Sequence, residues 1–111
     1  MANIKTVYPK DMDKRTAYRL TRANAKKVVD AAGSVITPSA YVLYEDEDIK
    51  SGELKTVLTF EADGEVFGTI SPVFIREFMD AANYFGGEIG SIKILTGETK
   101  NGREFVTCEV I

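Results

Sequence analysis

The sequence predicts a mainly β fold, a five-stranded barrel with one helix between its third and fourth strands and an extra N-terminal segment. Two observations predict it. From Ser39 onward, short runs of alternating apolar and polar residues are separated by turn signals about every ten residues, as in a small antiparallel sheet. One helical pattern interrupts these runs. With 111 residues, of which 44% are hydrophobic and 28% charged, we expect a single domain over residues 1–111.

The first three predicted strands lie between Ser39 and Ile70. Ser39 to Tyr44 forms the first, and Glu45 to Asp48 is expected to end it, because four adjacent carboxylates repel one another. Leu54 to Ala62 forms the second. Asp63-Gly64 predicts a tight hairpin turn into the third, Glu65 to Ile70. Alternation places Leu58, Phe60 and Ala62 on one face of the second strand and Val57, Thr59 and Glu61 on the other.

The helix is predicted to begin at Ser71-Pro72, where the serine caps free N–H groups and a proline in the first turn sacrifices no hydrogen bond. Gly86-Gly87 is expected to end it. An apolar stripe at helical spacing is assigned to the core. Its members are Phe74, Ile75, Phe78, Met79, Ala82 and Phe85.

Two further strands follow the helix. The fourth contains Ile92 and Ile94, and Lys100 to Arg103 predicts the turn into the fifth. In the fifth strand Val106, Cys108 and Val110 are expected to face inward, which leaves Arg103, Phe105 and Thr107 facing outward. This order of five strands and one helix is that of an OB-type barrel.

The segment before Ser39 permits two interpretations. Arg15, Arg19, Arg22 and Lys26 make one basic face at helical spacing, which favours a helix. Thr16 to Arg22 also alternates, with Tyr18 and Leu20 on one side, which favours a strand. We favour the strand, followed by a helical turn near residues 24–32 that stops at Gly33. Residues 1–27 are expected to pack on or beside the barrel.

Charge is distributed unevenly along the chain. The first 27 residues hold eight of the fourteen basic residues and two of the seventeen acidic ones, a net charge of +6 in a protein of net charge −3. Such polarity draws a polyanion to one side of a protein, so nucleic acid is the first partner to consider.

Several function classes are disfavoured by the inventory of residues. The chain has no histidine and a single cysteine, Cys108, which excludes histidine-based triads and zinc sites that need histidine or several cysteines. Glu45 to Asp48 lacks the ligand spacing of a calcium loop. We expect no catalytic residues, metal or cofactor, hence no enzyme. No apolar run of about 20 residues or signal sequence is present, so a cytoplasmic protein with no membrane partner is expected.

Binding of single-stranded nucleic acid requires cations for the phosphates and flat side chains for the unstacked bases. Tyr18 lies among arginines, and Phe105 lies beside a basic turn. Either ring could instead pack in the core, as most large aromatic side chains do. The predicted nucleic-acid-binding residues are Lys14, Arg15, Tyr18, Arg19, Arg22, Lys100, Arg103 and Phe105.

Segments 13–22 (DKRTAYRLTR), 42–48 (VLYEDED), 63–80 (DGEVFGTISPVFIREFMD) and 100–110 (KNGREFVTCEV) resemble the small single-stranded DNA-binding proteins of bacteriophages and mobile elements of Gram-positive bacteria. The resemblance runs over nearly the whole chain and implies an OB-like fold, protection of replicating single strands and a bacterial host cytoplasm. The acidic tail by which bacterial single-strand binders recruit replication proteins is absent before Ile111, so recruitment by that route is not supported.

The leading hypothesis is therefore a non-enzymatic, largely sequence-independent binder of single-stranded DNA in phage or mobile-element replication. It requires the basic segment and some exposed rings to share one strip. The alternative is a protein-interaction or virion-assembly module, a homo-oligomer in which the basic segment of one copy pairs with the acidic body of the next.

Overall fold

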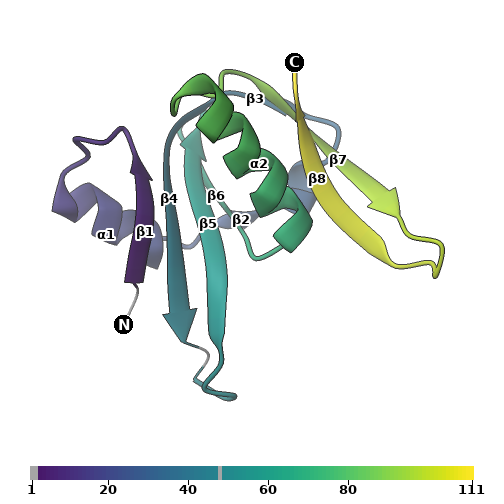
Figure 1. Cartoon of the computed structure of the whole chain (residues 1–111), viewed down its shortest axis with the longest axis horizontal. Coiled ribbons are helices and arrows are strands. Elements are labelled where there is room, and N and C mark those ends of the chain that lie inside the picture. Colours follow the sequence, from purple (N-terminus) through teal and green to yellow (C-terminus); the bar gives the residue numbers. More distant parts are fainter. Residues whose placement is uncertain (1–2, 48) are drawn as a thin grey trace.

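The computed structural model describes residues 3–47 and 49–111 and shows a mainly β fold with two sheets and two α-helices (Figure 1). The elements in chain order are β1 Asn3–Tyr8, α1 Lys14–Arg22, β2 Lys26–Lys27, the 3-10 helix η1 Val28–Ala31, β3 Val35–Ile36, β4 Pro38–Glu47, β5 Leu54–Ala62, β6 Glu65–Thr69, α2 Pro72–Phe85, β7 Ile92–Glu98 and β8 Glu104–Val110.

The larger sheet has the strand order β1-β4-β5-β6-β2. All neighbours are antiparallel except β2, which joins β6 in parallel through two residues. Strand β5 spans the predicted residues, and Leu58, Phe60 and Ala62 are fully buried on one of its faces. Asp63 and Gly64 both have positive φ angles, 53° and 79°, as the predicted hairpin turn requires.

The smaller sheet has the order β3-β7-β8. Strand β3 leads directly into β4, so one run of chain, residues 35–47, takes part in both sheets. Among the described strands no ladder joins β6 to β8, so the two sheets do not close into a barrel. The prediction of a mainly β fold is confirmed, but the prediction of a five-stranded barrel is wrong because the two sheets do not close. The strands β1, β2 and β3 were also not predicted.

The prediction of a strand over residues 16–22 is wrong, because Lys14–Arg22 forms the helix α1. The helix begins at Asp13, whose Oδ1 accepts a 2.7 Å hydrogen bond from the Thr16 backbone N–H. Ala17 and Leu20, three residues apart, are its buried residues. Helical spacing buries both while the cations stay in water, which explains why the helix forms here.

Helix α2 forms as predicted. The Ser71 side chain accepts a hydrogen bond from the Phe74 backbone N–H, Pro72 occupies the first turn, and Gly86 ends the helix at a φ of 75°. Phe74 and Phe78 are fully buried. Phe85 is 53% exposed, so its assignment to the core is wrong; it lies in the last turn, beyond the part of α2 that is buried.

The large sheet has a core on each face. The main core lies under α2, where Phe60, Phe74 and Phe78 stack with ring centroids 5.4 to 6.2 Å apart. Burial of each such side chain contributes about 1.5–3 kcal/mol. The second core is smaller and lies under α1, where Ala17 and Leu20 pack with buried side chains of β4.

Two further predictions about strand ends are wrong. Strand β4 continues through Glu45, Asp46 and Glu47 instead of ending before them, because the ladder with β5 runs on to the Glu47–Leu54 pair; Asp48 lies outside the described residues. At the end of β8, Val110 is 43% exposed instead of buried in the core, whereas Cys108 is buried as expected.

We expect the Cys108 thiol to be unreactive in the folded protein. Burial, with a smaller contribution from the charge of Glu77, raises the pKa of Cys108 from 9.0 to about 12. At pH 8 the reactive thiolate is therefore scarce, and the sulfur is covered. A disulfide reagent should label Cys108 slowly in buffer and rapidly in guanidinium. Rapid labelling of folded protein would contradict this burial.

Candidate nucleic-acid interface

Helix α1 presents a basic outer face. Its buried side is fixed to the sheet by Ala17 and Leu20, and its opposite side carries exposed cations. The sequence of the helix holds no acidic residue. Among the described residues, none of these cations forms an ion pair within 4 Å. The exposed cations are Lys14, Arg15, Arg19 and Arg22.

Tyr18 stands among these cations with 60% of its surface exposed. The Arg22 guanidinium lies over its ring, 5.4 Å from the centroid, at a distance typical of a cation–π contact. Two shallow depressions flank the ring. One, of about 500 Å³, is lined by Lys14, Arg15 and Arg19, and the other, of about 390 Å³, by Arg19, Arg22 and Leu20. A flat ring edged by guanidinium groups suits an unstacked base and its phosphates.

The basic surface continues beyond α1 along residues 23–27. Lys26 forms an ion pair with Glu65 at 2.8 Å, so its charge is partly balanced. Lys27 is exposed and forms no ion pair with any described residue. The segment passes close over β6: a Cβ added to Gly68 would lie 3.1 Å from the Ala25 Cβ. A larger residue at position 68 would push this segment away from the sheet.

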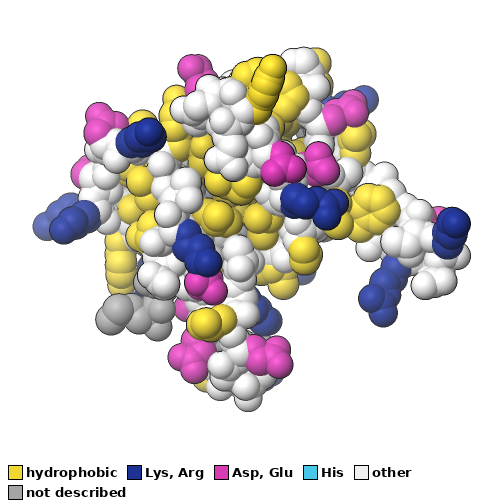
Figure 2. Space-filling view, in the orientation of Figure 1, with side chains coloured by type: hydrophobic (Ala, Val, Ile, Leu, Met, Phe, Trp, Pro, Cys, Tyr) yellow, Lys and Arg dark blue, Asp and Glu magenta, His cyan; other side chains and the backbone are white. Residues whose placement is uncertain are grey.

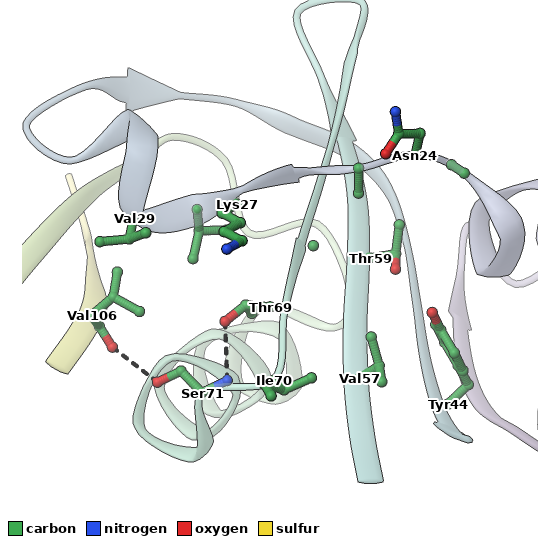
Figure 3. Close-up of a pocket in the computed structure, with 14 residues that line it drawn as sticks. Asn24, Lys27, Val29, Tyr44, Val57, Thr59, Thr69, Ile70, Ser71 and Val106 are labelled. Carbon is green, nitrogen blue, oxygen red and sulfur yellow. Dashed lines mark hydrogen bonds between the residues drawn. The ribbon is translucent and has the colours of Figure 1, made fainter. Parts of the chain in front are cut away.

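An open groove lies beside this basic segment on the α1 side of the large sheet, and we call it the sheet groove (Figure 3). Its volume is about 670 Å³. In Figure 3, Asn24, Lys27 and Val29 lie along one wall of the groove. Val106 of β8 lies at one end, and Val57 and Thr59 of β5 lie toward the other. The lining is mostly apolar, from Val28, Val29, Tyr44, Val57, Ile70 and Val106.

Hydrogen bonds hold the two ends of the sheet groove. At one end the Tyr44 hydroxyl donates to the Thr21 carbonyl oxygen at 3.4 Å, which ties β4 to α1. At the other end the Ser71 hydroxyl donates to the Val106 carbonyl oxygen at 3.2 Å, and the Thr69 hydroxyl accepts from the Ser71 backbone N–H at 3.0 Å. The groove is therefore fixed by the framework of the fold.

The remaining predicted site residues lie on the β7–β8 hairpin. Lys100 and Arg103 are exposed at its turn. Phe105 is half-buried, because its ring lies over Gly97, directly across the ladder: a Cβ added to Gly97 would lie 2.5 Å from the Phe105 ring. Phe105 therefore covers the backbone of its own hairpin and offers less free ring surface than Tyr18.

The structure divides the predicted site residues into two groups. Lys14, Arg15, Tyr18, Arg19 and Arg22 lie together on α1, whereas Lys100, Arg103 and Phe105 lie on the β7–β8 hairpin. These two groups occupy opposite ends of the longest dimension of the molecule, which is 40 Å (Figure 1). The sheet groove, which reaches from residue 23 next to α1 to Val106 on β8, lies between them.

Sequence reasoning missed the sheet groove. Three other aromatic side chains of the large sheet, Tyr41, Tyr44 and Phe67, are buried at 3 to 6% exposure and offer no ring face for stacking. The alternation of β5 did predict that Val57 and Thr59 face away from the main core, but it gave no sign that residues 23–29 would form a wall over them.

Comparison of the chain with protein-family models, with curated proteins and with solved structures found no significant match. Within the described residues, no helix has the length and apolar character needed to cross a membrane.

Helix α1 should lose stability at low pH through its cap. The hydrogen bond from the Thr16 backbone lowers the pKa of Asp13 below its ordinary value of 3.8. A lowered pKa means that the stabilisation is complete above the unfolded pKa and is lost as pH falls through the folded pKa. Asp13→Asn keeps an acceptor without the titration, so its thermal midpoint should fall less between pH 5 and pH 2 than that of wild type. Equal falls would contradict this role of Asp13.

Proposed function

We propose that the chain is a non-enzymatic protein that binds single-stranded DNA with little sequence preference, in the replication of a phage or mobile element. The observation that carries the proposal is the exposed Tyr18 ring among the exposed cations of α1, next to an open apolar groove. The replication setting comes from the resemblance described above.

The charge of the basic segment supports a polyanionic ligand. Residues 14–27 contain six basic and no acidic side chains, while the rest of the chain is acidic. Because the described ion pairs neutralise only Lys26 of these six, the field of the segment is directed to the solvent. Phosphates bound there release counterions, which supplies affinity without reading sequence.

The apolar lining of the sheet groove supports a single strand in preference to a duplex. A duplex keeps its bases stacked inside and presents phosphates, whereas a single strand offers flat apolar base faces. Val57, Val29 and Ile70 give such faces a surface to cover, and Lys27 stands at the wall for a phosphate. The polar side chains of the lining, Asn24, Lys27, Thr59, Thr69 and Ser71, are a minority beside its apolar residues, which agrees with binding that tolerates any base.

The pairing of the strands supports an OB-like arrangement for this site. If residues 35–47 are counted as one bent strand and the edge strands β1 and β2 are left out, five strands remain. The bent strand then pairs with β5 and with β7, and α2 lies between the third and the fourth strand. OB folds bind oligonucleotides on the face of their second and third strands. Here those strands are β5 and β6, which carry the floor of the sheet groove.

Affinity for oligo-dT should fall steeply with salt. The logarithm of the association constant changes by about −0.7 per phosphate contact for each logarithmic unit of salt, so four to six contacts predict a slope of about −3 to −4. Fluorescence anisotropy at several salt concentrations measures it. If the β7–β8 hairpin also holds phosphates, the K100Q/R103Q variant should make the slope about 1.4 less negative, because two contacts are lost. Binding to oligo-dT no tighter than to a duplex would overturn the proposal.

Tyr18→Ala should weaken oligo-dT binding by about 1–3 kcal/mol, the value of one stacked base. Tyr84→Ala is the matched control, because Tyr84 is also an exposed helical tyrosine, at 77%, but lies on α2. Thermal unfolding of both variants should remain close to wild type, since neither ring is in a core. Equal affinities for the two variants would show that Tyr18 does not stack on bases.

A further inference from the structure

The hairpin between β4 and β5 carries charge opposite to that of α1. We call residues 45–47 and 49–55 the acidic hairpin; they contain four acidic and two basic side chains, a net charge of −2. Glu45 forms an ion pair with Lys5 at 3.1 Å, near the root of the hairpin. Asp46, Glu47 and Glu53 lie exposed farther out. Figure 2 shows acidic side chains on the projecting lower end of the molecule.

The acidic hairpin also exposes apolar side chains at its end. Ile49 is fully exposed and Leu54 is 68% exposed. Strands β4 and β5 are paired out to Glu47 and Leu54, so Leu54 lies at the end of a projecting two-stranded arm, and Ile49 lies in the turn beyond it (Figure 1). An apolar end with carboxylates around it is complementary to an apolar depression with a basic rim. Docking there would bury the apolar side chains and pair the opposite charges.

The depression of about 390 Å³ beside Tyr18 has this complementary character. Its apolar part is formed by Leu20, Ala23 and Val66, and its rim carries Arg19 and Arg22. One carboxylate, Glu61, also lines it. We propose that the acidic hairpin of one copy of this chain docks in this depression on α1 of a second copy, with its apolar end inside and its carboxylates on the two arginines.

Within one chain the hairpin and the depression are held apart by the same paired strands. The hairpin that enters the depression therefore belongs to a second copy. Glu61, which lines the depression, lies near one end of β5, whereas Leu54 of the hairpin lies at the opposite end of the same strand. The ladder therefore holds the hairpin end away from its own α1. Each copy offers one hairpin and one depression, so the contact is head-to-tail and generates chains or rings.

Single-stranded DNA and the acidic hairpin would use the same arginines, so they should compete for α1. Only this competition rests on the proposed function. The docking of two copies is a separate statement, measured without nucleic acid, and it stands or fails whether or not the protein binds DNA.

A charge-reversal exchange tests the docking, with sedimentation velocity at about 50 and 500 mM salt, where screening differs strongly. Wild type should associate at low salt and dissociate at high salt. The D46K/E47K and R19E/R22E variants should each be monomeric alone, because hairpin and α1 then carry like charges. Mixed in equal amounts they should associate, because each variant again meets an opposite charge. The D80K/E88K variant is the control, with the same net charge as D46K/E47K but unchanged partners.

The outcomes separate clearly. Association of the mixture but not of its components, with the control behaving as wild type, supports the docking. Wild type that stays monomeric at low salt overturns it, as does a control that loses association to the same extent. Ile49→Ser should weaken association about tenfold or more without changing thermal unfolding; an unchanged dissociation constant would overturn the role of the apolar end. Oligo-dT that binds without dissolving the assembly would overturn the competition.

Discussion

The structure depends on the pairing of β4 with β5, because this ladder is the common wall of both cores. Successive side chains of a strand point to opposite faces, so Tyr41 and Phe60 enter the main core under α2 while Val42 and Tyr44 enter the core under α1. A shift of register by one residue would exchange these two sets. The side chains that now pack against α1, among them Val42 and Tyr44, would then face α2, and α1 would lose the apolar surface on which it packs. Both helices are therefore positioned by one alternation pattern.

The sheet groove follows from the incomplete cover of the second face of the large sheet. Helix α2 has fourteen residues and spans the main core, whereas α1 has nine and covers only part of the opposite face. Residues 23–29 cross the rest without filling it, which leaves the sheet groove. The close contact between Gly68 and Ala25 sets how near this segment lies to β6. A groove formed in this way needs no dedicated pocket residues, which suits a ligand recognised by its flat faces.

The sequence predicted elements that are specified locally and missed those specified by distant partners. Strand β5 with its buried face, the Asp63-Gly64 turn and α2 with its cap all depend on neighbours within a few residues. Strands β2 and β3 have two residues each and exist only because β6 and β7 lie beside them. For residues 16–22 both periodicities were present, and the Asp13 cap with the buried pair Ala17 and Leu20 decided for the helix. The site residues were predicted as one set, and their division between opposite ends of the molecule required the fold (Figure 1).

The division of the cations into two groups changes what the proposed function requires. A single basic strip would hold a strand by charge alone, whereas here the α1 group and the Lys100 and Arg103 group are separated by an apolar groove. In the proposed complex, a DNA strand that spans both basic groups lays its bases on the groove between them. The electrostatic and apolar contributions to affinity are then coupled, because phosphates held at either end raise the effective concentration of bases at the groove. A strand too short to reach both groups loses this gain, and so does any partner that occupies α1. Under the proposed function, the arginines of α1 are therefore the residues that DNA and any other acidic partner would share.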